Sequence, residues 1–251
     1  MKAFVAFTKK EFLESFCSFR AVVLLAAFAL MGVICPLFIK YAVDARGSDV
    51  QGVFPLEFTA MESWQAFFGG IDMLGIMILA IVFCGIMANE LSQGTLINLL
   101  TKGLRRSTVI LAKFLTASIL WTISYLLGIT ICSIIIMCYG PGDAINYVFF
   151  AFLAPWLLGE LLIATLVLGG VLLKSYWGAL VVLLVAIAIL STVLTAPETL
   201  KYNPMSITGG SLELLSGQKN PAYFAPVFIT YAAITTTLVV AAIAKFNKKQ
   251  L

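Results

Sequence analysis

Six long apolar stretches divide the 251 residues of this chain, and each is about wide enough to cross a lipid bilayer. A spanning helix needs about 20 apolar residues, at about 1.5 Å of rise per residue. Hydrophobic residues make up 61% of the sequence and charged residues only 11%, whereas a soluble domain has about 25% charged residues. Because unpaired backbone polar groups cannot face lipid, we expect these stretches to be helices. The sequence predicts an all-α integral membrane protein with a single transmembrane domain over residues 1–251.

We expect six transmembrane helices, separated by modest loops. Their ranges are about 21–39, 66–88, 114–138, 149–173, 175–196 and 222–244. The preceding residues, 1–20, carry too many charges for a cleavable signal peptide. Val5, Phe12, Phe16 and Phe19 fall on one stripe of a helical wheel, away from the charged side chains. This pattern predicts an N-terminal interfacial helix, with a solvated, frayed tail as the alternative.

The basic residues are distributed unevenly between the two sides of the predicted bundle. With six spans both termini lie on one side, which holds twelve of the sixteen basic residues: Lys2, Lys9, Lys10, Arg20, Lys102, Arg105, Arg106, Lys113, Lys174, Lys245, Lys248 and Lys249. Basic loops favour the cytoplasm, so we expect both termini to be cytoplasmic. The net charge of +4 follows from this asymmetry and does not indicate a nucleic-acid partner.

The residue inventory excludes several classes of chemistry. The sequence has no histidine, so catalytic triads built on His and His-ligated zinc are excluded. It has no phosphate-binding loop of the G-x-x-x-x-G-K-[ST] type, so the chain is not expected to hydrolyse nucleotides. The five cysteines are isolated and lie in or beside apolar spans, where we interpret them as small hydrophobic residues. We expect no catalytic residues, no metal site and no bound cofactor.

Residues 89–113, between the second and third predicted spans, form the most informative segment. The apolar set Leu96, Leu99 and Leu100 has helical spacing and predicts a short helix on the cytoplasmic face. Gly103 is placed to end that helix. Arg105, Arg106 and Lys113 are expected at the depth of the lipid headgroups, where they can pair with anionic lipid. Taken alone, the pattern is also compatible with an ordinary amphipathic connector.

Two other segments carry information. Glu160 lies near the middle of the fourth span, and an acid at that depth usually faces a bundle interior or a cavity. It either lines a transport path or holds helices together through a Ser or Thr. The loop at 197–222 is rich in Pro and Gly, and its residues 211–215 have the composition of one helical turn.

The 89–113 segment resembles the cytoplasmic loop of type-2 ABC (ABC-2) exporter permeases. In that family the second span ends in a Glu, followed by Gly-Thr or Gly-Ser, a Leu-rich turn, a basic element and a Lys at the start of the third span. The residues that match this pattern are Glu90, Gly94, Thr95, Leu99, Leu100, Arg105, Arg106 and Lys113, and we count Leu96 of the apolar set with them as a candidate ATPase-coupling residue. Gly103 and Ala112 depart from it, since Pro and Gly are common there, but neither change removes a charge.

The resemblance implies that residues 89–113 form a coupling helix that docks on a separate cytosolic ATPase. It also implies a second permease copy or a sister permease, short helices in the outer loop at 197–222, and ATP and Mg²⁺ bound only by the ATPase. The expected location is the plasma (inner) membrane of a bacterium, as a multi-pass protein. The alternatives are an ion-coupled secondary transporter, a membrane-embedded enzyme and a non-transporting scaffold, of which the enzyme fits worst because the spans lack His and paired acids.

Overall fold

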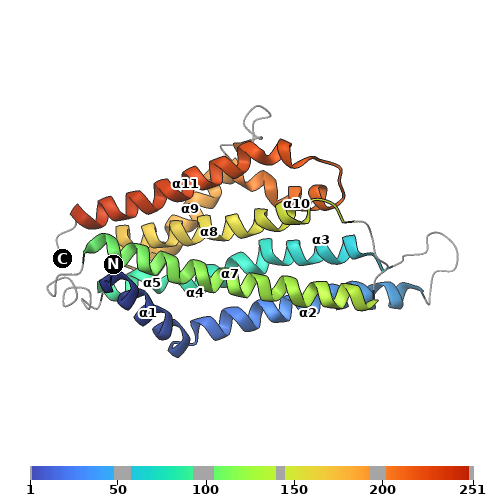
Figure 1. Cartoon of the computed structure of the whole chain (residues 1–251), viewed down its shortest axis with the longest axis horizontal. Coiled ribbons are helices and arrows are strands. Elements are labelled where there is room, and N and C mark those ends of the chain that lie inside the picture. The colour runs from blue at the N-terminus through green and yellow to red at the C-terminus, as the bar shows by residue number, and fades with distance from the viewer. Residues whose placement is uncertain (1, 48–57, 93–104, 140–144, 193–201, 249–251) are drawn as a thin grey trace.

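The computed structural model describes residues 2–47, 58–92, 105–139, 145–192 and 202–248, and nearly all of these residues are helical. Within these ranges there are no strands. The predicted all-α fold class is therefore confirmed for the described part of the chain. Figure 1 shows a bundle of long helices that run along one common axis.

The first third of the chain forms two long helical segments. α1 covers Lys2–Cys17, and α2 covers Arg20–Gly47. Between them Phe19 has a φ of 58°, a left-handed conformation that ends α1 and redirects the chain. The second segment comprises α3 (Ala60–Gly70), the π-helical η1 (Ile71–Gly75), α4 (Ile76–Phe83) and α5 (Gly85–Ser92). Its start is fixed by Thr59, whose side chain accepts a hydrogen bond from the Glu62 backbone N–H at 3.3 Å.

The remaining helices complete the bundle. They are α7 (Arg106–Tyr139), α8 (Val148–Leu173), α9 (Tyr176–Thr192), the 3-10 turn η3 (Pro204–Ser206), α10 (Ile207–Leu215) and α11 (Pro221–Lys248). Lys174 has a left-handed φ of 50° and donates its backbone N–H to the Gly170 carbonyl, which ends α8. η3 and α10 fall within 197–222, where the sequence predicts short helices.

Five helical segments in the described ranges are long and apolar enough to cross a membrane: Arg20–Ala45, Ala60–Ala88, Arg106–Tyr139, Val148–Leu173 and Pro221–Lys248. They coincide with the first four and the last of the predicted spans. α9 lies at the remaining predicted span, 175–196, and its 17 described residues are apolar but shorter than the others. Five of the six predicted spans thus correspond to helices of spanning length, and the span at 175–196 stays a prediction.

α2 extends further than the sequence predicts. The predicted span ends at residue 39, directly before the charged Lys40, but the helix continues to Gly47. The Lys40 ammonium lies 3.6 Å from the centroid of the Tyr139 ring at the end of α7. A cation over an aromatic face is stabilised by the ring quadrupole, so this charge is accommodated beside the bundle without ending the helix.

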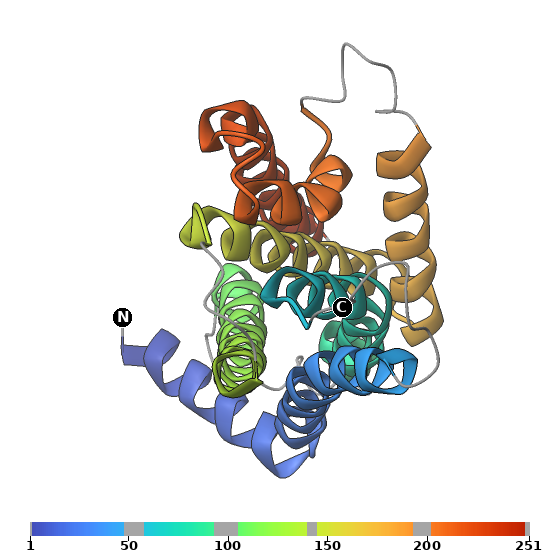
Figure 2. The ribbon, with the colours of Figure 1, turned by 90° about the vertical axis from the view of Figure 1, so that its right-hand side faces the viewer.

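α8 occupies the middle of the bundle. Figure 2 shows it between α11 on one side and α7 with the α3–α5 segment on the other, and most of its residues are buried. α2 packs along α7 at a close crossing, where a Cβ added to Gly32 would lie 2.6 Å from the Gly128 carbonyl oxygen. Small residues at such crossings let two membrane helices approach through their backbones.

Four elements meet at one end of the bundle: α1, the end of α5, the start of α7 and the end of α11 (Figure 1, left). The N-terminal and C-terminal helical ends therefore lie at the same end of the bundle, which is where the prediction of six spans would put them. α1 runs obliquely across this end, beside α7 and the start of α2 (Figures 1 and 2).

Candidate functional site

The structure describes only part of the predicted coupling residues, and that part lies at this end of the bundle. Gly94, Thr95, Leu96, Leu99 and Leu100 lie outside the described residues. Glu90 belongs to α5, with its side chain also outside the described part. Arg105 and Arg106 are described, because α7 begins at Arg106. The contacts made by the start of α7 therefore carry the structural information about this segment.

Arg106 joins the start of α7 to the end of α11. Its Nη1 donates hydrogen bonds to the backbone carbonyls of Phe246 at 2.9 Å and Asn247 at 3.0 Å, and its guanidinium lies 5.8 Å from the centroid of the Phe246 ring. The last carbonyls of a helix have no partner within the helix and carry partial negative charge. Arg106 thus caps α11, whereas the exposed Arg105 has no such role.

Lys113, two turns further along α7, makes a second link. Its ammonium lies 2.8 Å from a carboxylate oxygen of Glu11 in α1, with side-chain exposures of 2% for Lys113 and 7% for Glu11. The prediction that Lys113 pairs with anionic lipid is therefore wrong, because its ammonium is buried and pairs with Glu11. Residues inside the bundle supply the countercharge, because an unpaired ammonium would be costly to bury there.

The burial of Glu11 shows which side of α1 faces the bundle. Phe7, Glu11 and Ser15 are buried against the bundle, while Val5, Phe16 and Phe19 are exposed. The stripe predicted from Val5, Phe12, Phe16 and Phe19 therefore faces mainly outward, as an interfacial helix in contact with lipid requires. The charged side is divided, because Glu11 faces inward to meet Lys113.

A more exposed pair flanks Glu11 on α1. The Lys10 ammonium lies 2.8 Å from a Glu14 carboxylate oxygen and 3.6 Å from the second oxygen of Glu11. The hydrogen bond from Lys10 lowers the pKa of Glu14 below its usual value, with partial burial opposing the shift. Lys10 thus contacts two carboxylates of α1. The buried one, Glu11, also pairs with Lys113 of α7.

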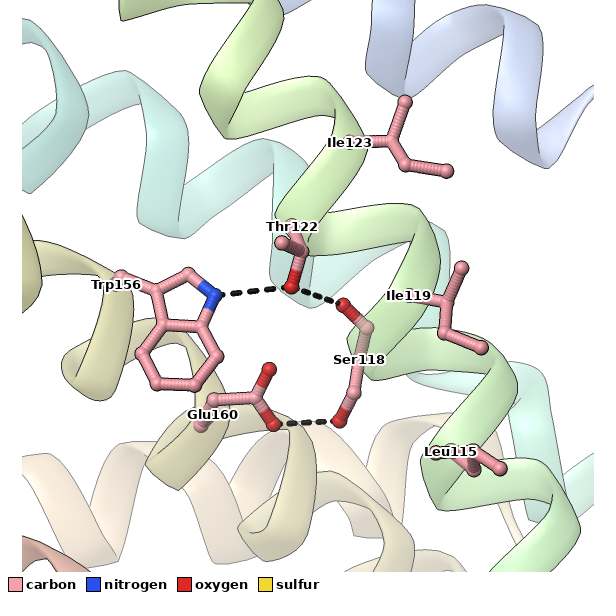
Figure 3. A pocket seen from close by; sticks show the side chains of 7 residues that line it. All are labelled: Leu115, Ser118, Ile119, Thr122, Ile123, Trp156 and Glu160. Atoms are coloured by element: carbon pink, nitrogen blue, oxygen red, sulfur yellow. Dashed lines mark hydrogen bonds between the residues drawn. The ribbon is translucent and has the colours of Figure 1, made fainter.

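Glu160 lies deep in the bundle, on the face of α8 toward α7 (Figure 3). Its Oε2 accepts a hydrogen bond from the Ser118 hydroxyl at 2.5 Å. One turn along α7, the Thr122 hydroxyl accepts from the Trp156 indole N–H at 2.9 Å and donates to the Ser118 carbonyl at 2.7 Å. Of the two alternatives that the sequence leaves open for Glu160, the hydrogen bond to a Ser or Thr of another helix is present, and a role in lining a transport path stays a prediction.

These polar groups line a cavity of about 350 Å³ between α7 and α8, walled elsewhere by aliphatic side chains of α7 (Figure 3). A second cavity of about 360 Å³ continues from it and shares Thr122 and Trp156 as lining residues. The second cavity is aromatic and aliphatic, with Phe149 and Phe152 of α8 facing Leu126 of α7. α7 and α8 therefore enclose an extended groove with one polar part.

The cysteines and acids form no metal centre in the described part of the chain. Within those residues, no group of three or more His, Cys, Asp or Glu side chains could hold a metal ion. All five cysteines, at positions 17, 35, 84, 132 and 138, are free thiols, and only Cys132 is buried.

Comparison with protein families gives one decisive match. Residues 18–195 match the model of the ABC-2 family transporter protein, which is more than half of the chain. The chain belongs to the ABC-2 transporter family. No match was found among curated proteins. The resemblance predicted from the 89–113 segment is thereby confirmed at the level of the family, and the chain is a multi-pass membrane component of a transporter.

The family match covers the whole segment from α2 through the described part of α9, including Glu90, the start of α7 and Glu160. Two features of this ABC-2 protein lie outside it: α1 with Glu11, and α11 with the carbonyls that Arg106 caps. The matched region is therefore tied, through the start of α7, to helices that precede and follow it.

Sequence reasoning missed the partners of Lys113 and Glu160. Lys113 and Glu11 are 102 positions apart, and no local pattern reports such a contact. For Glu160 a signal was present: Ser118 and Thr122 in one span, and Trp156 and Glu160 in the next, are each spaced by four residues. That spacing puts each pair on one helix face.

Proposed function

We propose that this chain is the permease subunit of an ATP-driven exporter and works as a dimer with separate cytosolic ATPase subunits. In this proposal six helices cross the membrane, with α9 as the fifth, and both termini are cytoplasmic. ATP and Mg²⁺ bind on the ATPase, and residues 89–113 transmit its movement. The basic residues at the end of the bundle that holds α1 and the end of α11 support this orientation.

The observation that carries the proposal is the double anchoring of α7 directly after the predicted coupling helix. Arg106 bonds the end of α11, and Lys113 forms a buried ion pair with α1. A displacement of residues 93–104 by a docked ATPase would be passed to α7, α1 and α11 together. Rigid elements with defined contacts transmit such movement better than a loop that lies on lipid.

The orientation is tested with single cysteines in a variant that lacks the five native ones. We expect a cysteine at Asn98 to be protected from a membrane-impermeant maleimide in intact cells and to react after lysis. A cysteine at Ser48, in the predicted outer segment, is the control and should react in intact cells. Reaction at position 98 in intact cells would place the coupling segment on the wrong side.

The coupling itself is tested by affinity purification of the tagged chain from its native membrane and detection of a co-purifying ABC ATPase by mass spectrometry. Leu99→Asp should remove the ATPase from the purified complex, because a charge replaces part of the apolar ridge. Leu56→Asp makes the same change in the predicted outer segment and should leave the complex intact. Retention of the ATPase by the Leu99 variant would contradict the assignment of the ridge.

An ion-coupled transporter is the second candidate, favoured by one observation. Glu160 is a buried carboxyl beside a cavity in the middle of a spanning helix, and acids in such places serve as ion or proton sites in other transporters. Uptake into proteoliposomes driven by an ion gradient, with no ATPase present, would favour this function over ATP-driven export.

A further inference from the structure

The two cavities between α7 and α8 form one elongated groove. Its lining on α7 runs from Leu115 to Ile129, which is about 21 Å at about 1.5 Å per residue. Several lining side chains are open to the surroundings, among them Ile123, Leu126 and Phe149. Since α7 and α8 are both of spanning length, the groove lies along the membrane-embedded part of the protein and is accessible from the lipid side.

The groove has a polar part and an apolar part. The polar part holds the Glu160 carboxyl with the hydroxyls of Ser118 and Thr122, and the indole of Trp156 lies beside it (Figure 3). The apolar part is lined by the aromatic rings and aliphatic chains that include Phe149 and Leu126. An occupant that matches both parts has one small polar group and a single apolar chain.

The hydrogen-bond pattern identifies the polar group. Ser118 gives its hydroxyl proton to Glu160 Oε2, and Trp156 and Thr122 also have acceptors for their protons. Glu160 Oε1 is buried and has no hydrogen-bond partner among the described residues. None of the described lysines or arginines forms an ion pair with this carboxylate. The groove therefore presents one unused carboxyl oxygen, and a donor with positive charge complements it because it stabilises the ionised carboxylate.

We propose that this groove binds a single-chain amphiphile with a primary ammonium group. The ammonium donates a hydrogen bond to Glu160 Oε1 beside the Trp156 ring, and the alkyl chain lies along Phe149 and Leu126. A cation next to an indole gains a further attraction from the ring. A carboxylate or phosphate in this position would instead be repelled by Glu160, and the described lining has no basic side chain to offset that repulsion.

The same reasoning separates a free amine from a membrane lipid. A phosphoethanolamine headgroup also carries a primary ammonium, but its phosphate would enter the groove with it. We therefore assign the site to an amine without phosphate. Binding requires only the membrane-embedded helices, so this inference goes beyond the proposed transport function and does not depend on the ATPase.

The test uses the full chain in phosphatidylcholine nanodiscs and radiolabelled dodecylamine, with empty nanodiscs subtracted for partition into lipid. We expect saturable binding, and we expect dodecanol, which has the same chain and no charge, to compete at least about tenfold more weakly, as a charge-assisted hydrogen bond implies. Glu160→Gln should weaken dodecylamine binding by about the same factor. The affinity for dodecanol should be the same in this variant as in the wild type. Asp72→Asn, which removes another acid of a spanning segment, should bind like the wild type.

Two further arms keep the result interpretable. Glu160→Asp keeps the charge on a shorter side chain, so it should retain the preference for the amine even if the affinity falls. Replacing half of the lipid with phosphatidylethanolamine should leave dodecylamine binding in place. Equal binding of amine and alcohol, an unaffected Glu160→Gln variant, or loss of binding in phosphatidylethanolamine would each overturn the proposal. Failure of ATPase co-purification would leave it untouched.

Discussion

The buried ion pair between Glu11 and Lys113 gives the strongest stability prediction. The two charged groups are 2.8 Å apart and almost fully removed from solvent, so screening by water and salt is weak. Removing one member leaves the other buried without this countercharge, which in buried pairs costs about 3–5 kcal/mol. We therefore expect Lys113→Met and Glu11→Leu each to lower the free energy of unfolding by about that amount. The equilibrium constant for folding would then fall at least about a hundredfold.

The double variant distinguishes a true pair from two independent effects. With both charges replaced by apolar side chains of similar size, no unpaired charge remains, and such replacements in other proteins are often neutral or stabilising. We expect the double variant to be markedly more stable than either single variant, with a coupling energy of roughly 3 kcal/mol or more. The measurement is reversible unfolding in mixed micelles with increasing dodecyl sulfate, followed by circular dichroism.

Lys10 supplies the matched control. It also approaches Glu11, at 3.6 Å, but its side chain is 51% exposed. Exposed pairs contribute about 0–1 kcal/mol, so Lys10→Met should change the unfolding free energy by less than about 1 kcal/mol. Additive costs in the Glu11/Lys113 double variant, or a Lys10 variant as damaging as the Lys113 variant, would refute the reasoning.

Three further substitutions test contacts elsewhere in the bundle, each by the same unfolding measurement. Arg106→Gln should cost about 1–2 kcal/mol, because the last carbonyls of α11 lose a charged donor, while the exposed Arg105→Gln should cost less than about 0.5 kcal/mol. Gly159→Ala should cost about 1–3 kcal/mol, because its Cβ would overlap a tryptophan ring of α7; Gly69→Ala adds a methyl where nothing lies within 4 Å and should be neutral or stabilising. Tyr231→Phe should cost about 1 kcal/mol, since its hydroxyl donates at 2.8 Å to a carbonyl of η3.

The helices could be predicted from the sequence because the property that defines them is local. Long uncharged windows indicate spanning helices whatever they pack against, and four-residue spacing indicates which side chains share a face. Helix ends were less accurate because they depend on distant partners. Lys40 shows this, since the ring that accommodates its charge belongs to Tyr139, in another helix.

The candidate site could likewise be predicted only where the signal is local. Glu160 stands out in the sequence because it is the one acid of the fourth apolar window and lies near its middle. Lys113 and Arg106 were assigned to lipid because headgroups are the default partner of a cation at the membrane surface. Their actual partners are 102 and 140 positions away, and the helical wheel of α1 gives no reason to turn Glu11 inward. Charge pairing between remote helices requires the fold to be known.

One glycine connects the packing of α8 to the chemistry of Glu160. Gly159 precedes Glu160 and has no side chain, so the Trp121 indole of α7 lies directly against the α8 backbone. Trp121 also donates its N–H to the Trp156 carbonyl at 3.1 Å, and Tyr125 donates to the Phe152 carbonyl at 2.8 Å. These contacts hold α7 and α8 close enough for Ser118 to reach Glu160. A side chain at position 159 would separate the helices at the same level, so that position should control both the stability of the bundle and the geometry of the groove.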